Sequence, residues 1–160
     1  LTGHLVLSTV HANDAPGTVT RLVDMGVPRY LVGSAVSLVM AQRLVRRVCD
    51  RCRETFTAER EHIAPLGEDG AALEGRPIAI GRGCLACKQT GYSGRTALFE
   101  VLELNKVVRR MVLDGMNEDQ IKQRTMAEGL QTLRKAGIRK ILDGLTTIEE
   151  IKAVTLADHV

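Results

Sequence analysis

Residues 49–52 read Cys49-Asp50-Arg51-Cys52 and residues 84–87 read Cys84-Leu85-Ala86-Cys87, and these two segments contain every cysteine of the 160-residue chain. Within each segment two residues separate the cysteines, a spacing that lets both thiolates turn toward one ion. Two such pairs supply the tetrahedral set of four sulfurs that zinc favours. We therefore predict one zinc site with the ligands Cys49, Cys52, Cys84 and Cys87. Because four protein sulfurs leave no position for a substrate, we expect this zinc to be structural.

Two other arrangements of the same cysteines stay open, namely two disulfides and four free thiols in a core. Zinc is the favoured interpretation because nothing else in the sequence indicates an oxidising compartment. A redox enzyme of the thioredoxin type is disfavoured, since neither pair opens a helix after a strand. The segment between the pairs, Arg53 to Gly83, is longer than in the commonest zinc-ribbon pattern. We expect this segment to form structure of its own.

Aromatic side chains are scarce in this sequence, which has two tyrosines, two phenylalanines and no tryptophan. Proteins that bind single-stranded nucleic acid stack its bases on aromatic rings, so this composition argues against that class. The net charge of +3 is too small to indicate a partner. No stretch approaches the roughly 18 apolar residues that span a bilayer, and no signal peptide is recognised. We therefore expect a cytoplasmic protein.

The first residues of the chain have the pattern of a buried strand. Leu5 to Val10 form an apolar, β-branched run with His4 and His11 at its ends. A buried strand of the parallel type needs neighbours that this sequence barely supplies, so we expect a piece of a longer protein. His11 would follow the carboxyl end of the strand, where open α/β sheets place their ligand sites and an imidazole can donate to a phosphate oxygen. A turn histidine bonded to backbone is the alternative.

Helix signals account for most of the remaining chain. Asn13 or Asp14 is placed to cap a helix that ends at Gly26. A second, apolar helix is predicted over residues 27–44, and a strand over residues 96–104. Caps and glycine stops predict four further helices over residues 106–113, 118–128, 132–142 and 147–154. Asn105 and Asn117 are placed to cap the first two, and Thr147 with Glu150 forms the pattern of a capping box at the start of the last.

Nucleotide hydrolysis by this chain alone is not predicted. The phosphate-binding pattern GxxxxGK[ST] is absent, and no glycine is followed by lysine. Arg21, on the first predicted helix, is a candidate phosphate clamp, with a solvated surface arginine as the alternative. The segment Gly91-Tyr92-Ser93-Gly94-Arg95 is interpreted as a turn that leads into the predicted strand.

Several segments, in their order along the chain, are similar to the motifs of one protein family. Thr2-Gly3-His4-Leu5 through Ser8-Thr9-Val10-His11-Ala12-Asn13 resembles a His box, and Gln42-Arg43-Leu44 resembles the segment that leads into a metal domain. The four cysteines, the 91–95 turn and Glu100 resemble a tetracysteine motif. The tail from Gly144 to Glu150 resembles the family's usual ending. The family is the secretion ATPase superfamily that powers type II secretion and type IV pilus assembly.

This resemblance, which covers nearly the whole chain, implies an α/β fold in three parts. Residues 1–48 would be the carboxyl-terminal part of a RecA-like nucleotide-binding domain. Residues 49–104 would be a small tetracysteine zinc domain, and residues 105–160 a helical tail. The phosphate-binding loop, the Asp box and the Walker B carboxylate of the family have no counterpart in this sequence. The resemblance therefore implies a fragment of an ATPase that does not hydrolyse ATP alone.

The same resemblance implies partners, cofactors and site residues. Family members act as cytoplasmic rings, commonly hexamers, that use ATP and Mg and pass their motions to inner-membrane partners. Carried onto this sequence, His4 and His11 would be catalytic residues on the γ-phosphate side of the site. Arg21 would contact the nucleotide.

A zinc-ribbon nucleic-acid-binding module is the alternative function. Five arginines surround the first cysteine pair and could contact phosphates, namely Arg43, Arg46, Arg47, Arg51 and Arg53. The scarcity of aromatic residues and the acidic segment beside the same pair argue against it, so no nucleic-acid partner is expected. A salt titration distinguishes the two functions, since a DNA binder loses about 0.9 log units of affinity per phosphate contact per log unit of salt.

Overall fold

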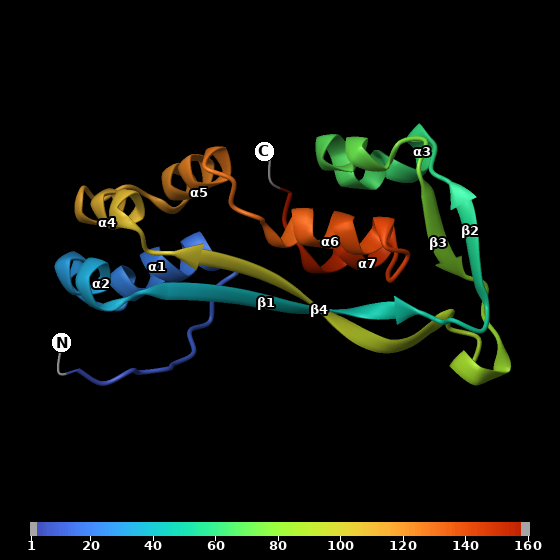
Figure 1. Cartoon of the computed structure of the whole chain (residues 1–160), viewed down its shortest axis with the longest axis horizontal. Coiled ribbons are helices and arrows are strands. Elements are labelled where there is room, and N and C mark those ends of the chain that lie inside the picture. Colours follow the sequence, from blue (N-terminus) through green and yellow to red (C-terminus); the bar gives the residue numbers. More distant parts are fainter. Residues whose placement is uncertain (1–2, 158–160) are drawn as a thin grey trace. The chain divides into compact units, whose positions relative to one another are not determined.

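The computed structural model describes residues 3–157, so Thr2 of the predicted His box lies outside the described residues. It is a mixed α/β structure with two two-stranded sheets (Figure 1). Along the chain the elements are α1 (Ala15–Asp24), α2 (Arg29–Ala35), β1 (Leu38–Val48), β2 (Arg53–Thr57), α3 (Arg60–Ile63), the 3-10 segment η1 (Ala64–Leu73), β3 (Pro77–Gly81), the 3-10 turn η2 (Leu85–Cys87), β4 (Tyr92–Glu103), α4 (Lys106–Leu113), α5 (Glu118–Ala127), α6 (Leu133–Leu142) and α7 (Ile148–Val154). None of these helices is long and apolar enough to cross a membrane.

The described chain forms two compact units. The helical unit ends at Ala41 and resumes over Glu100–Gln131, and the cysteine unit comprises Gln42–Phe99 together with the chain from Thr132 on. Strands β1 and β4 pair with each other, and each strand passes from one unit into the other. The division into three domains that the resemblance implies stays a prediction.

Helices α1, α2, α4 and α5 build the helical unit, and three of them begin at side-chain caps that the sequence predicts. The carboxylate of Asp14 accepts the backbone N–H of Gly17 at 2.8 Å, and Asn105 and Asn117 cap α4 and α5 in the same way. Helix α2 packs on α4, and α1 packs on α5. The buried apolar side chains of these helices are Ala15, Val19, Val32, Val108, Met111, Val112 and Ile121. The predicted helices over 106–113 and 118–128 are thereby confirmed, apart from the last residue of the second.

Residues 38–48 form strand β1, so the prediction of one helix over 27–44 is wrong beyond Ala35. Burial alternates along β1, with Val39 and Val45 buried and the residues on either side of each more exposed. A period of two is that of a strand, whereas burial along a helix follows a period of 3.6. Pairing with β4 provides partners for the backbone of β1. Exposed apolar residues on the second face of the strand hid this alternation in the sequence.

Residues 5–10 form an extended segment rather than the predicted buried strand (Figure 1). The side chains of Leu5 and Leu7 are 89% and 88% exposed. A strand forms only where a second strand accepts and donates its backbone hydrogen bonds, and no strand of residues 3–157 pairs with this segment. The prediction of a buried strand over residues 5–10 is therefore wrong for the described chain, where the segment has no strand to pair with.

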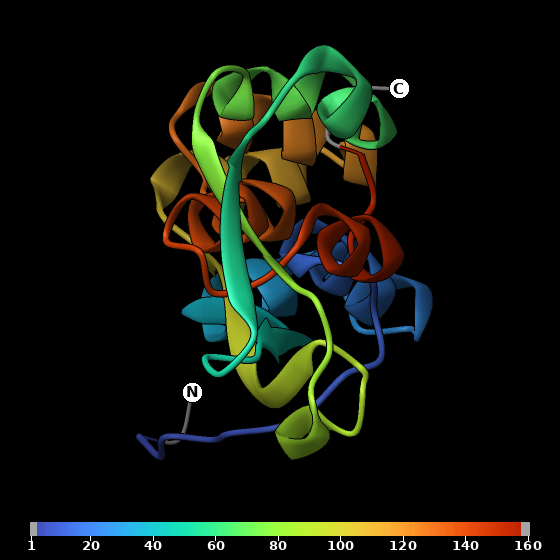
Figure 2. The same cartoon turned by 90° about the vertical axis from the view of Figure 1, so that its right-hand side faces the viewer.

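The segment between the cysteine pairs forms structure of its own, as expected. Strand β2 pairs with β3 in antiparallel register, so that Phe56 lies opposite Ile78. Helix α3 and η1 connect the two strands and lie at one end of this small sheet (Figure 2). Buried Leu66 and Leu73 of η1 contribute to the core of the cysteine unit.

Helices α6 and α7 pack on η1 in the cysteine unit, and a buried arginine ties these elements together. Arg134 is 4% exposed, and its guanidinium lies 3.7 Å from the carboxylate of Asp69 in η1. The same guanidinium donates to the carbonyl oxygens of Thr155 and Leu156, just beyond α7. Because a buried cation needs nearby acceptors, this contact set fixes the end of α7 against η1.

The start of α7 differs from the sequence prediction in one side chain. The sequence predicts a capping box between Thr147 and Glu150. Thr147 does cap the helix, but the carboxylate of Glu150 accepts hydrogen bonds from the backbone N–H and the guanidinium of Arg46 instead. The guanidinium of Arg46 also lies 4.2 Å from the centre of the Tyr92 ring. A long-range ion pair therefore replaces the Glu150 half of the predicted capping box, while Thr147 still caps the helix.

Glu150→Gln is expected to lower the free energy of unfolding by about 1–2 kcal/mol, because the charged bonds to Arg46 become weaker and Arg46 is half-exposed. Burial alone would raise the pKa of Glu150, but the hydrogen bonds from Arg46 outweigh it and lower that pKa. A carboxylate whose pKa is lowered by folding stabilises the folded state fully at any pH above its pKa in the unfolded chain, about 4.3. This stabilisation is lost only as the pH falls toward and through the lower pKa of the folded state. Urea unfolding should thus give the same loss at pH 6 and pH 8. The exposed neighbour Glu149, changed to Gln, is the control, and a loss confined to one of the two pH values would contradict this account.

Candidate metal centre

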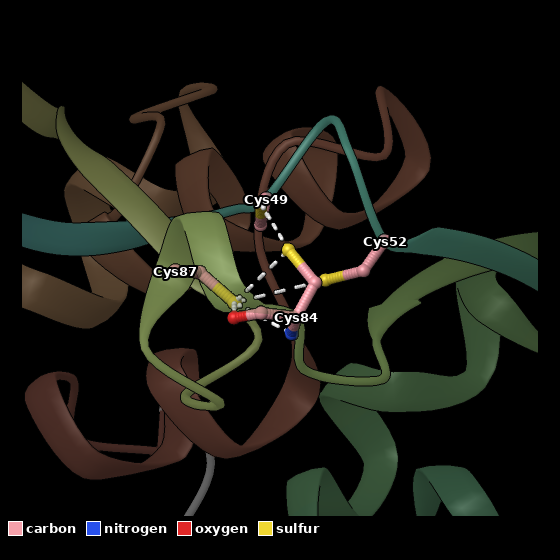
Figure 3. Close-up of side chains that lie close together, drawn as sticks. All are labelled: Cys49, Cys52, Cys84 and Cys87. Atoms are coloured by element: carbon pink, nitrogen blue, oxygen red, sulfur yellow. Dashed lines mark hydrogen bonds between the residues drawn. The ribbon is translucent and has the colours of Figure 1, made fainter.

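The four cysteines come from two connections between strands, one from β1 to β2 and one from β3 to β4. Cys49 directly follows β1, and Cys52 directly precedes β2. Cys84 and Cys87 lie in the connection from β3 to β4, with Cys87 at the end of η2. Their side chains converge on one point (Figure 3). We call this group the tetracysteine cluster.

The spacing of the sulfur atoms fits a tetrahedral metal site. All four Sγ atoms lie within 4.8 Å of one another. Three Sγ–Sγ distances are 4.0 Å (Cys49–Cys84), 3.8 Å (Cys52–Cys87) and 3.7 Å (Cys84–Cys87). In a regular tetrahedron with metal–sulfur bonds of about 2.3 Å, each sulfur lies about 3.8 Å from the others. The cluster therefore has the size that a four-sulfur ion site requires.

Neither alternative arrangement of the cysteines matches this geometry. A disulfide requires an S–S distance of about 2.05 Å, and all four cysteines are free thiols. Four unrelated core thiols would have no reason to point at one centre from two different connections of the chain. No other group of three or more histidine, cysteine or carboxylate side chains of residues 3–157 is close enough to hold a metal ion.

A tight backbone turn positions the second cysteine pair. Lys88 and Gln89 both have positive φ angles, 53° and 63°, although neither is glycine. The left-handed conformation is unfavourable for such residues and is retained where surrounding contacts require it. Here the N–H of Gln89 donates to the carbonyl of Cys84, and the N–H of Thr90 donates to that of Cys87. The turn thereby brings the two thiols of the pair to one side.

Backbone donors surround the sulfur of Cys87. The N–H groups of Cys84 and Gly91 lie 3.2 and 3.3 Å from this Sγ atom. Burial raises the pKa of the Cys87 thiol, but these two donors and the neighbouring thiols outweigh that effect and lower the pKa to about 6. Burial raises the pKa of the Cys52 thiol to about 12. Cys87 therefore carries the most thiolate character of these two, and thiolates are the form that binds a metal.

Backbone contacts hold the two cysteine pairs together. The N–H of Cys49 donates to the carbonyl of Gly91, and the N–H of Arg82 donates to the carbonyl of Cys52. Gly81, at the end of β3, approaches Gly91 so closely that a Cβ atom on Gly81 would lie 2.0 Å from the carbonyl oxygen of Gly91. The site therefore depends on glycine at this position as well as on the cysteines.

The cluster can bind an ion and has no ligand position left for catalysis. Cys49 and Cys87 are buried, while Cys52 and Cys84 are half-buried. Four thiolates complete a tetrahedral shell, whereas catalytic zinc sites keep one position for water or substrate. The arrangement is thus that of a structural metal site.

His4, His11 and Arg21 lie outside this cluster, in the helical unit. His4 and His11 are exposed on the extended segment, and Arg21 is exposed on α1. The structure brings the four cysteines together and forms no comparable group of metal-type side chains around either histidine within residues 3–157. Their roles toward a nucleotide stay predictions.

Glu100 is a buried carboxylate for which the sequence motifs indicate no separate role. It is 1% exposed, and its Oε1 accepts the N–H of Ala15 at 2.8 Å, at the start of α1. An acidic side chain at the start of α1 satisfies a backbone N–H that has no partner within the helix. The sequence contains one sign of this role. Glu100 lies between Leu98 and Leu102 on the buried face of β4, where a charged residue is unusual. Glu100 thus holds the first residue of α1 against β4.

Comparison with known proteins places these features in one family. The family model described as Type II/IV secretion system protein matches residues 1–153. The chain is 40% identical over 156 residues to "Type IV pilus assembly ATPase PilB" of Thermus thermophilus, which covers 98% of this chain and 18% of that protein. It is 42% identical over 155 residues to "Type II secretion system protein E" of Pseudomonas aeruginosa, covering 97% of this chain and 30% of that protein.

A third relative is "Type II secretion system protein E" of Klebsiella pneumoniae, which is 44% identical over 160 residues, covering 97% of this chain and 30% of that protein. The chain thus spans less than a third of the length of these curated relatives. The match of the family model extends through both compact units. The chain therefore belongs to the Type II/IV secretion system protein family.

Proposed function

We propose that this chain is the carboxyl-terminal part of a cytoplasmic ATPase that powers type II protein secretion or type IV pilus assembly. The observation that carries the proposal is the match of 40–44% identity over 97–98% of the chain to proteins with those names. ATP and Mg would bind in the complete protein, since the chain has no phosphate-binding loop. The chain alone would not hydrolyse ATP.

Within that protein, residues 1–48 would complete a RecA-like nucleotide-binding domain, and residues 49–104 and 105–160 would be the zinc domain and the helical tail. His4 and His11 would lie on the γ-phosphate side of the site, and Arg21 would contact the nucleotide. The extended segment 5–10 supports this role, because its apolar side chains are exposed in the described chain and fit a strand that pairs with a further part of a sheet.

The tetracysteine cluster would hold a structural zinc ion. Sulfur spacings of 3.7–4.0 Å and the absence of any other ligand type support zinc over hard cations, which prefer oxygen. The ion would fix the ends of β1, β2 and η2 in one place. It would contribute to the stability of the cysteine unit and not to hydrolysis.

The complete protein would act as a homo-oligomer, and the family resemblance implies a hexamer. It would contact inner-membrane assembly proteins without entering the membrane. A nucleic-acid module is not favoured, because the family match names secretion and pilus proteins and the chain offers few aromatic rings for stacking.

The test is steady-state ATP hydrolysis by the complete protein over a range of protein concentrations, with the 160-residue chain as the control. The proposal expects specific activity that rises with concentration in the complete protein, as in a ring with shared sites, and no activity in the chain alone. Hydrolysis by the isolated chain, or steep salt-dependent DNA binding without any hydrolysis in the complete protein, would reject it.

His11→Ala in the complete protein is expected to slow ATP hydrolysis about tenfold to a hundredfold, the loss of one charge-assisted hydrogen bond to phosphate. His11 is exposed in the 160-residue chain, so the melting temperature of this chain should stay unchanged by the same substitution. His62→Ala is the matched control, since His62 is exposed on α3 and has no proposed role. Equal turnover in both variants and the unchanged protein would remove His11 from the site.

A further inference from the structure

A groove of about 750 Å³ lies between α4 and α5 in the helical unit, and neither the metal centre nor the proposed nucleotide site uses it. Helix α4 packs mainly on α2, and α5 packs mainly on α1, so the two helices leave a channel between them that is open to solvent. The residues that line it are Lys106, Val107, Arg110, Met111, Asp114, Met116, Gln120, Gln123, Arg124 and Ala127.

The floor of the groove is apolar and adaptable. Met111 is buried, while Val107 and Met116 are 40% and 39% exposed and present their side chains to the channel. Methionine is unbranched and polarisable, and surfaces that bind the apolar faces of helices use it repeatedly. An apolar floor of this kind favours aliphatic side chains of a partner.

The rim of the groove is basic. Lys106, Arg110 and Arg124 line it together with one carboxylate, that of Asp114. Arg110 pairs with Asp114 at 3.0 Å and Arg124 with Glu128 at 3.1 Å, but both guanidiniums are largely exposed, 75% and 63%. Exposed pairs of this kind are weak, so carboxylates of a partner can compete for these cations. Charge complementarity therefore points to an acidic occupant.

We propose that the α4–α5 groove binds an amphipathic helix of a partner protein, with an apolar face flanked by Asp or Glu residues. The apolar floor would receive side chains spaced as i, i+3, i+4 and i+7, and the basic rim would pair with the flanking carboxylates. A nucleotide is disfavoured because none of the ten lining residues is aromatic and the base would have no ring to stack on. An open channel also suits a helix better than the enclosed pocket typical of a small ligand.

The test uses a fluorescent helical peptide of about four turns with leucines on one face and glutamates flanking it, titrated into the 160-residue chain. Saturable binding is expected, and it should weaken as salt is added, because exposed charges are screened. A peptide with lysines in place of the glutamates should bind at least about tenfold more weakly, as like charges then meet at the rim.

Two variants locate the binding site. Arg124→Glu reverses a rim charge, and Val107→Asp places a charge in the floor, where a carboxylate in the first turn of α4 is compatible with the helix. Each is expected to weaken binding of the acidic peptide at least about tenfold. Arg60→Glu is the matched control, because Arg60 is an exposed, ion-paired arginine of the cysteine unit and should leave binding unchanged. Thermal melting verifies that each variant is folded, and either groove variant suffices for the test.

Four results would overturn the proposal. Absence of binding by the acidic peptide, or binding that both Arg124→Glu and Val107→Asp leave unchanged, would exclude an acidic helix as the occupant. Binding to phosphatidylglycerol vesicles that Arg124→Glu abolishes, without binding of the peptide, would identify a lipid surface instead. Self-association of the chain that Val107→Asp abolishes, again without peptide binding, would identify a second copy of this chain.

Discussion

Cys84→Ser is expected to remove the metal ion and to unfold the cysteine unit. A structural zinc ion bound by four thiolates supplies about 10 kcal/mol or more of binding free energy, which is folding free energy when the site does not exist in the unfolded chain. Whole domains are stable by only about 5–15 kcal/mol. The geometry strengthens this expectation, because Cys84 lies 4.0 Å from the sulfur of Cys49 and 3.7 Å from that of Cys87. Its loss therefore affects both pairs.

The measurement combines metal analysis of the purified chain with thermal melting followed by circular dichroism. The expected result for Cys84→Ser is loss of bound zinc and loss of the main melting transition. Leu85→Ala is the matched control, since Leu85 lies in the same turn, is 90% exposed and has no thiol. Full zinc occupancy with an unchanged melting curve in Cys84→Ser would refute a structural metal site.

Gly81→Ala is the second change with a large expected effect, a loss of about 3 kcal/mol or more in unfolding free energy together with weaker metal binding. The added Cβ atom would lie 2.0 Å from the carbonyl oxygen of Gly91 and 2.6 Å from its carbonyl carbon. Backbone cannot rotate away as a side chain can, so β3 and the second cysteine turn must separate. That shift would disturb the hydrogen bond from the N–H of Cys49 to the same carbonyl.

Gly33→Ala provides the control for this substitution. Gly33 is buried, whereas Gly81 is half-buried, but a Cβ atom on Gly33 would meet its nearest neighbours at an ordinary 3.8 Å. Gly33 lies inside helix α2, where alanine is the better helix former. Urea unfolding and a competitive zinc-chelator titration should show a loss in Gly81→Ala only. Equal stability and equal zinc retention in the two variants would mean that β3 can move away from the cysteine turn at little cost.

Local signals in the sequence predicted the helices well. The caps Asp14, Asn105 and Asn117 each act within three residues of their own position, so the spacing of residues along the chain contains the whole interaction. Strand β1 was predicted as a helix because its two faces both contain apolar residues, and only the pairing with β4 decides between the two forms. The segment 5–10 was predicted as a strand from its composition alone, without a partner.

The grouping of the four cysteines was predictable for the same reason as the caps, since each Cys-x-x-Cys pair is a local motif, while the zinc ion stays a prediction. The backbone contact between Gly81 and Gly91 that holds the cysteines in place was not predictable. These two glycines meet only when β3 and the second cysteine turn have folded. The contact of Arg46 with Glu150 joins residues 104 positions apart, and no pattern within the sequence points to that partner. Long-range pairs of this kind can be identified only from the three-dimensional fold, because no single segment of the sequence contains both partners.

The position of the cysteines at strand ends has a consequence for the order of folding. Cys49 follows β1, and Cys87 lies shortly before β4, so an ion held by both closes the long loop between the two strands. The entropy of closing that loop, which grows slowly with its length, must be overcome before strands so distant in sequence can pair. If an ion joined the two cysteine pairs early in folding, β1 and β4 would pair outward from it as the arms of a hairpin pair outward from its turn. The proposed zinc would then shorten the effective separation of two strands that are distant in sequence.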